Sequence, residues 1–125
     1  MPNQGVTFDT VRKIGLALAG VEESTAYGSR ALKVRGKLLA CIPVNKAAEP
    51  NSLAVRVDFD QRAELLETDP RTYYLKDHYV NYPSVLVRLS EVQPDALKDL
   101  LTMAYRFVTA KPAGGKKKKT PRKFT

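Results

Sequence analysis

A β-hairpin can be read in residues 32–42, the stretch Leu32-Lys33-Val34-Arg35-Gly36-Lys37-Leu38-Leu39-Ala40-Cys41-Ile42. In its first part, apolar Leu32 and Val34 alternate with basic side chains, which is the pattern of a half-buried strand. Gly36 then permits a tight turn. The run from Leu38 to Ile42 is apolar on both sides, so we expect the second strand to lie in the centre of a sheet or beneath helices.

Three helices are predicted around this hairpin. Apolar side chains at helical spacing predict the first helix over residues 8–19. Asp58 and Gln61 resemble a capping box at the start of a second, short helix, which ends at Asp69 because a proline follows. Pro94 suits the first turn of a third helix, which ends where a basic tail begins.

The predicted strands are grouped between the terminal helices. They lie within residues 24–43, 53–57 and 85–89, where apolar residues alternate with polar ones or form short runs. This order indicates an α+β fold, an antiparallel sheet with helices packed on one face. One domain over residues 1–110 accounts for all of these elements. Residues 111–125 follow it as a basic tail that we expect to be disordered.

Composition favours a cytoplasmic protein. The chain has 125 residues, and no run approaches the ~20 apolar residues of a membrane span. The first residues lack the basic-then-apolar layout of a signal peptide. The single cysteine, Cys41, cannot form an internal disulfide, and its apolar neighbours predict a buried thiol.

Nearly all of the net charge of +8 lies in the tail. Residues 1–110 contain fourteen basic and thirteen acidic residues, whereas residues 111–125 contain seven basic residues and no acidic one. Such a block attracts polyanions, because each neutralised phosphate releases counterions, so we expect nonspecific nucleic-acid contact. A solubilising tail is the alternative, and neither an amphipathic helix nor a lipidation motif supports a membrane-surface role. The tail cations are Lys111, Lys116, Lys117, Lys118, Lys119, Arg122 and Lys123.

A tyrosine-rich window is the second candidate site. Residues 73–83 contain four of the six tyrosines and the only histidine, His78. Tyrosine rings beside basic groups stack on unpaired bases, and Lys76, Tyr79 and Tyr82 would form such a site. The alternative is structural, with the rings covering the sheet edge and their hydroxyls holding a loop. No nucleophile or second metal ligand accompanies His78, so we interpret it as structural.

Basic side chains on the predicted strands are the third candidate. If neighbouring strands align them, they form a basic stripe or a hairpin wing that touches a phosphate backbone. Ordinary solvated positions balanced by nearby acids are the alternative. The residues are Lys33, Arg35, Lys37, Arg56 and Arg88.

The order of these segments resembles the MmcQ/YjbR family over residues 8–109. The resembling segments are residues 18–23, 32–38 and 53–58 and, above all, His78-Tyr79-Val80-Asn81-Tyr82-Pro83-Ser84-Val85-Leu86-Val87-Arg88-Leu89. The resemblance implies a compact α+β fold similar to the CyaY (frataxin-like) fold, and DNA binding through a "double wing". It implies no catalytic residues. The first helix carries too little acid for the iron binding of frataxins, so we expect no metal.

We therefore predict a nonenzymatic protein that binds DNA or other nucleic acid and needs no cofactor. The strand cations, Lys76, the two tyrosines and the tail would contact the polyanion. A small-molecule or protein-interaction module, built on the tyrosine window, is the alternative. The chain has no Gly-rich phosphate loop, nucleophile–base pair or metal-ligand cluster that would indicate an enzyme.

Overall fold

The computed structural model describes residues 6–26, 28–43 and 48–110. The basic tail, and with it the expectation that it is disordered, lies outside the described residues, as does the side chain of His78. The described part forms, in chain order, α1 (Phe8–Leu16), β1 (Val21–Ala26), β2 (Ser29–Val34), β3 (Lys37–Cys41), β4 (Ser52–Arg56), α2 (Phe59–Thr68), β5 (Tyr73–Tyr74), the short 3-10 helix η1 (Asp77–Tyr79), β6 (Ser84–Arg88) and α3 (Pro94–Thr109).

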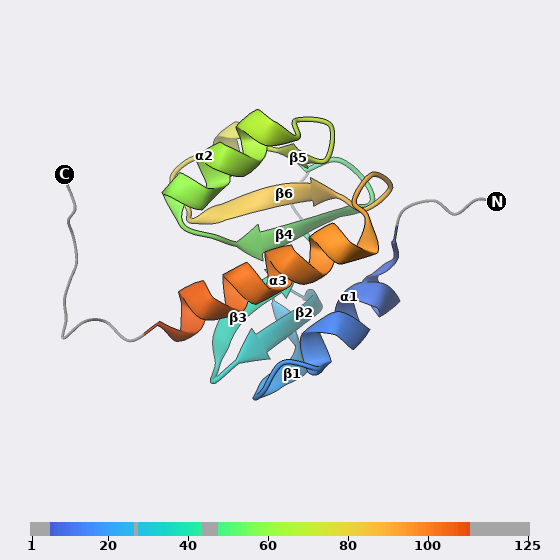
Figure 1. The fold of residues 1–125 in the computed structure, drawn as a ribbon. Coiled ribbons are helices and arrows are strands. Elements are labelled where there is room, and N and C mark those ends of the chain that lie inside the picture. The colour runs from blue at the N-terminus through green and yellow to red at the C-terminus, as the bar shows by residue number, and fades with distance from the viewer. Residues whose placement is uncertain (1–5, 27, 44–47, 111–125) are drawn as a thin grey trace.

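The strands form one antiparallel sheet in the order β1-β2-β3-β4-β6-β5. The first four strands are neighbours both along the chain and in the sheet, and β6 lies between β4 and β5. All three helices lie on the same face of this sheet (Figure 1). The predicted α+β class, an antiparallel sheet with helices on one face, is therefore confirmed.

The main core lies between the sheet and the helices. Val11, Leu97 and Leu101 of the helices are completely buried there, as are Leu32 and Leu53 of the sheet. Helical spacing and strand alternation bring these side chains to the same layer. A smaller cluster lies on the opposite side of the sheet, here called the rear face, and consists of Ala31, Cys41, Ala54, Tyr74 and Leu86.

The hairpin predicted from residues 32–42 is present as β2 and β3. Val34 pairs with Lys37, which leaves Arg35 and Gly36 as the two turn residues. Both have positive φ, 54° for Arg35 and 79° for Gly36, as in the type I′ turns whose twist matches antiparallel strands. Strand β3 lies between β2 and β4, so its predicted central position is also confirmed.

The first helix is shorter than predicted. It ends at Leu16 instead of residue 19, and the chain turns through Gly20, which has a φ of 82°. The following strand begins at Val21, three residues before the predicted strand region, because Val21 pairs with Val34 and is buried. Tertiary pairing therefore decides this boundary over local helical spacing.

The capping box at the start of α2 is formed on one side only. The side chain of Asp58 accepts a hydrogen bond from the backbone N–H of Gln61, with an N···O distance of 2.7 Å. The reciprocal bond of a capping box would use the Gln61 side chain, but its Oε1 atom is buried without a hydrogen-bond partner in the described part of the chain. The helix ends at Thr68, as the proline at position 70 predicts.

Candidate nucleic-acid interface

The turn between β2 and β3 presents three basic side chains. Arg35 and Lys37 are exposed, and Lys33 is half-buried. Lys33 lies opposite Glu22 of β1 in the strand register, yet no carboxylate of the described residues comes within 4 Å of any of the three cations. We call Lys33, Arg35 and Lys37 the hairpin cations.

Arg56 extends this basic surface onto the rear face. It ends β4, pairs in register with Ser84 and is half-buried. Burial raises the pKa of the neighbouring Cys41 thiol, which the positive charge of Arg56 partly offsets. Cys41 is only 5% exposed, so the predicted buried thiol is confirmed. The structure thus brings Arg56 to the same face as Lys33, with one strand between them.

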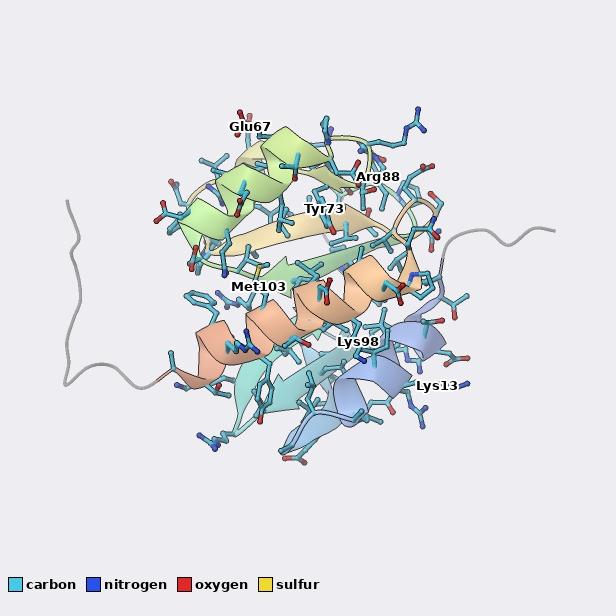
Figure 2. All side chains as sticks on the ribbon, in the orientation of Figure 1. Lys13, Glu67, Tyr73, Arg88, Lys98 and Met103 are labelled. Atoms are coloured by element: carbon cyan, nitrogen blue, oxygen red, sulfur yellow. The ribbon has the colours of Figure 1, made fainter. Side chains whose placement is uncertain are left out.

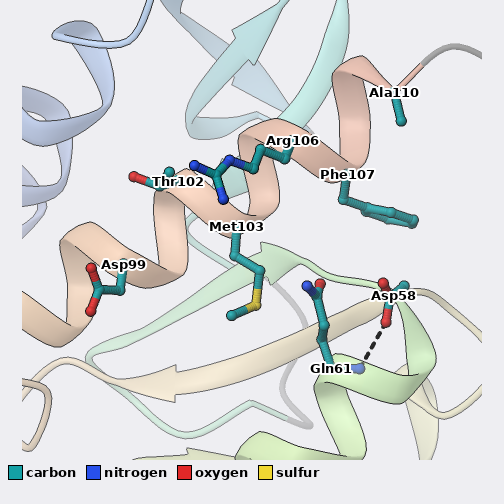
Figure 3. Close-up of a pocket in the computed structure, with 8 residues that line it drawn as sticks. All are labelled: Asp58, Gln61, Asp99, Thr102, Met103, Arg106, Phe107 and Ala110. Carbon is teal, nitrogen blue, oxygen red and sulfur yellow. Dashed lines mark hydrogen bonds between the residues drawn. The ribbon is translucent and has the colours of Figure 1, made fainter.

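The basic tail begins on the same side of the molecule. Ala110, the last described residue, lines a groove together with Asp58, which follows the end of β4 (Figure 3). Figure 1 shows this end of α3 on the side where the turn between β2 and β3 lies. The described chain thus ends, at Ala110, on the same side of the molecule as the hairpin cations.

Arg88 is held in an internal network and does not extend this surface. Its Nε and Nη2 atoms donate to the two carboxylate oxygens of Glu49 at 2.9 and 2.8 Å, and its Nη1 donates to the backbone carbonyls of Pro70 and Arg71. The guanidinium also stacks on the Tyr74 ring, 4.4 Å from its centroid. Since Arg88 already has these partners, we exclude it from the interface. Figure 2 labels Arg88 near the opposite end of the sheet from the C-terminal end of α3.

Most side chains of the tyrosine window have a structural role in the fold. Tyr73 and Tyr74 are buried, and the Tyr74 hydroxyl bonds the Ser52 hydroxyl and accepts from the N–H of Glu49. Tyr79 packs against the rear-face cluster. Tyr82, in contrast, is 53% exposed. Lys76 is exposed and lies 5.9 Å from the centroid of the Tyr74 ring.

Arg62 organises the loop that carries this window. Its guanidinium donates to the backbone carbonyls of Tyr79, Val80 and Tyr82 at 2.9 to 3.2 Å, and it lies 4.7 Å from the centroid of the Phe59 ring. Sequence reasoning missed this role, because an arginine in the first turns of a short helix is typical of a solvated position.

No candidate metal site is present in the described part of the chain. It contains no group of three or more His, Cys, Asp or Glu residues that could hold a metal ion. Nor does that part contain a helix long and apolar enough to cross a membrane.

Comparison with known proteins identifies the family. A family model described as YjbR matches residues 16–107. This chain belongs to the YjbR family. The match reaches from the end of α1 into the last turn of α3 and therefore includes the whole sheet, the hairpin cations and Arg56.

Relatives of this YjbR protein occur in mycobacteria. It is 37% identical over 113 aligned positions to the proteins named "Uncharacterized protein Mb2600" of Mycobacterium bovis and "Uncharacterized protein Rv2570" of Mycobacterium tuberculosis. Each alignment covers 79% of this chain and 85% of the relative. The crystal structure of Deinococcus radiodurans protein DR2400, with a DUF419 domain, is similar with a TM-score of 0.69 and 25% identity, covering 94% of this chain and 86% of that one. The same fold is therefore present in a solved structure.

Proposed function

We propose that this YjbR protein is a nonenzymatic, cytoplasmic protein that binds nucleic acid, DNA above all, through its phosphates. The hairpin cations, Arg56 and the tail make the contacts in this proposal. One observation supports it most: three cations with no carboxylate partner among the described residues lie at one turn, on the side of the molecule where α3 ends before the lysine-rich tail. Contacts of this kind orient a protein on nucleic acid without reading its sequence.

The conformation of Arg35 supports a role for the turn. Residues other than glycine rarely have a positive φ, and asparagine is among the few that tolerate it well. Arg35 has a φ of 54°, its side chain is exposed, and no ion pair within the described residues holds it there. Backbone strain of this kind concentrates at functional sites. An arginine is therefore held at the tip of the hairpin in spite of the turn's preference for other residues.

Replacing Arg35 by Asn should separate stability from binding. We expect Arg35→Asn to raise the free energy of unfolding by about 0.5–1 kcal/mol, because asparagine suits the left-handed position. The same change removes one phosphate contact, which should lower the affinity for duplex DNA about fivefold to tenfold near 0.1 M salt. Urea unfolding and fluorescence anisotropy measure the two effects. A more stable variant with unchanged affinity would exclude Arg35 from the interface.

The proposal is tested by removing two positive charges from the hairpin in one variant and two from the helices in a control variant. In one variant, Lys33→Gln and Lys37→Gln remove two hairpin cations, and in the control, Lys13→Gln and Lys98→Gln remove two exposed cations from α1 and α3 (Figure 2). We expect the hairpin variant to bind duplex DNA at least 10-fold more weakly than wild type, with a salt slope smaller by about 2. The control should change affinity less than about threefold. Equal losses in both variants would mean that only net charge matters, and the domain-level proposal would fail.

A protein-interaction module is the second candidate, because of the exposed apolar side chains around Arg62. Phe59, Val80 and Tyr82 are 48%, 42% and 53% exposed, and Arg62 contacts the Phe59 ring and the carbonyls of the other two residues. Exposed apolar side chains gathered on a fixed loop are typical of contact surfaces. A Phe59→Ser, Tyr82→Ser variant that keeps wild-type DNA binding but loses a reproducible protein partner would favour this function.

A further inference from the structure

A groove between α2 and α3 plays no part in the proposed nucleic-acid contacts. It has a volume of about 550 Å³, within the range typical of small-molecule sites. The first turn of α2 and the residue before it form one wall, and the second half of α3 forms the other (Figure 3). The lining residues are Asp58, Gln61, Asp99, Thr102, Met103, Arg106, Phe107 and Ala110.

The centre of the groove is apolar. Figure 3 shows Met103 pointing from α3 across the groove, toward the side where the amide of Gln61 lies. Met103 and Phe107 are only partly buried, so both retain surface that a ligand could cover. A flexible thioether beside an aromatic ring adapts to apolar groups of different shape. The groove therefore offers contact area to the apolar body of a small molecule.

Acceptors for hydrogen bonds lie on both walls. Asp58 and Asp99 form no ion pair with the described residues, and Asp58 uses one carboxylate oxygen to cap α2. Among the described lining residues only Arg106 is basic, and its guanidinium lies along α3 beside Thr102 in Figure 3. Thr102 already donates its hydroxyl to the carbonyl of Lys98. Two carboxylates against one guanidinium favour a cationic ligand over an anionic one.

The amide of Gln61 adds an unsatisfied acceptor. Its Oε1 atom is buried and has no hydrogen-bond partner in the described part of the chain. A buried acceptor without a donor is destabilising, and such atoms in native structures call for an explanation. Rotation about the terminal bond of glutamine is soft, so the oxygen can turn into the groove when a donor arrives. An N–H donor in the groove would satisfy it.

We propose that this groove binds an organic ammonium ion, an amine with an apolar body. The apolar body packs on Met103 and Phe107, and the ammonium group donates to Asp58 and Gln61, which lie next to each other at one end of the groove. Ala110 joins the groove to the basic tail, but no lining residue is assigned a nucleic-acid contact, so the two proposals can fail independently.

Methyl NMR tests the site directly, because the chain contains only two methionines, Met1 and Met103. The full chain labelled with ¹³C-methyl methionine is titrated with phenethylammonium, and separately with phenylacetate, which has the same ring and the opposite charge. We expect a saturable shift of the Met103 methyl signal, with a Kd of about 1 mM or below, only with phenethylammonium. No shift, or the same shift with phenylacetate, would overturn the proposal.

Variants separate the ligand contacts from folding. Asp58→Asn, which keeps an oxygen to cap α2, should weaken phenethylammonium binding about threefold to fivefold. Glu67→Gln, the same charge change at an exposed position on the outer side of α2 (Figure 2), should leave binding unchanged. Gln61→Leu should weaken binding and raise the urea midpoint of the free protein, because it removes the unsatisfied acceptor. A lower midpoint would show that Oε1 already has a donor and would overturn its role. Equal effects of Asp58→Asn and Glu67→Gln on binding would mean that the ammonium ion senses only the overall charge of the protein.

Discussion

Replacing Lys116, Lys117, Lys118 and Lys119 by Gln should lower the affinity for duplex DNA about 100- to 1000-fold near 0.1 M salt. These four residues are consecutive and follow a segment without acidic residues. If each neutralises one phosphate in the wild-type complex, the slope of log K against log salt becomes shallower by about 3–4. Fluorescence anisotropy titrations between about 50 and 200 mM salt measure both the affinity and the salt slope.

A charge-preserving variant is the matched control for the tail. Replacing the same four lysines by Arg keeps the charge and should leave the affinity within about threefold of wild type, because nonspecific phosphate contacts depend mainly on charge. A salt slope that stays the same after the change to Gln would show that the tail does not contact phosphates. The hairpin cations would then be the whole interface.

Arg88→Met should be the most destabilising of the changes considered, reducing the free energy of unfolding by about 1–2 kcal/mol. Methionine keeps much of the apolar contact with Tyr74 but donates no hydrogen bond. The carbonyls of Pro70 and Arg71 and the carboxylate of Glu49 then lose their shared donor. Urea unfolding monitored by circular dichroism measures the change, which should appear as a lower midpoint with an unaltered m-value.

Arg71→Met is the control for this prediction, since Arg71 is an exposed arginine beside the same network. We expect it to change stability by less than about 0.5 kcal/mol. If Arg88→Met were equally mild and instead weakened DNA binding, Arg88 would return to the interface from which its contacts exclude it.

Protonation of Glu49 makes the contribution of this network to stability depend on pH. Its hydrogen bonds from Arg88 lower the pKa of Glu49 below the ordinary value of 4.5. Because the pKa of Glu49 is lower in the folded protein than its ordinary value, the ion pair stabilises the fold at pH values above that ordinary pKa. This stabilisation is lost as the pH falls through the pKa of Glu49 in the folded protein. Wild type and Glu49→Gln should therefore differ in stability at neutral pH and converge in acid. A difference that persists in acid would show that the Glu49 charge is not its source.

Local signals in the sequence predicted the elements that depend on neighbours along the chain. The β2–β3 hairpin, the Asp58 cap of α2 and the start of α3 at Pro94 all rest on residues within a few positions of one another, and the structure confirms them. The start of β1 at Val21 could not be predicted in this way, because it depends on pairing with Val34 across the hairpin.

The candidate sites show the same difference between features set by neighbours along the chain and features set by distant residues. The turn at Gly36 was predicted, but Arg35, predicted on the strand, is the first turn residue. Nothing local distinguishes Arg56 from Arg88, because each is the last residue of a strand. Arg88 is separated from Glu49 by 39 positions, and only the fold reveals that they form a pair. The contacts of Arg62 with the loop of Tyr79 to Ser84 and the groove beside Met103 likewise depend on elements that the sequence alone does not place together.

The strand order also has a consequence for synthesis on the ribosome. The nascent chain completes the four-stranded meander early, and local hairpins of this kind form quickly. The apolar layer over β3 and β4 remains uncovered until α3, the last described element, supplies Leu97, Leu100 and Leu101. Translation that stalls between α2 and α3 should therefore leave an aggregation-prone intermediate that requires a chaperone, whereas release after α3 lets the core close.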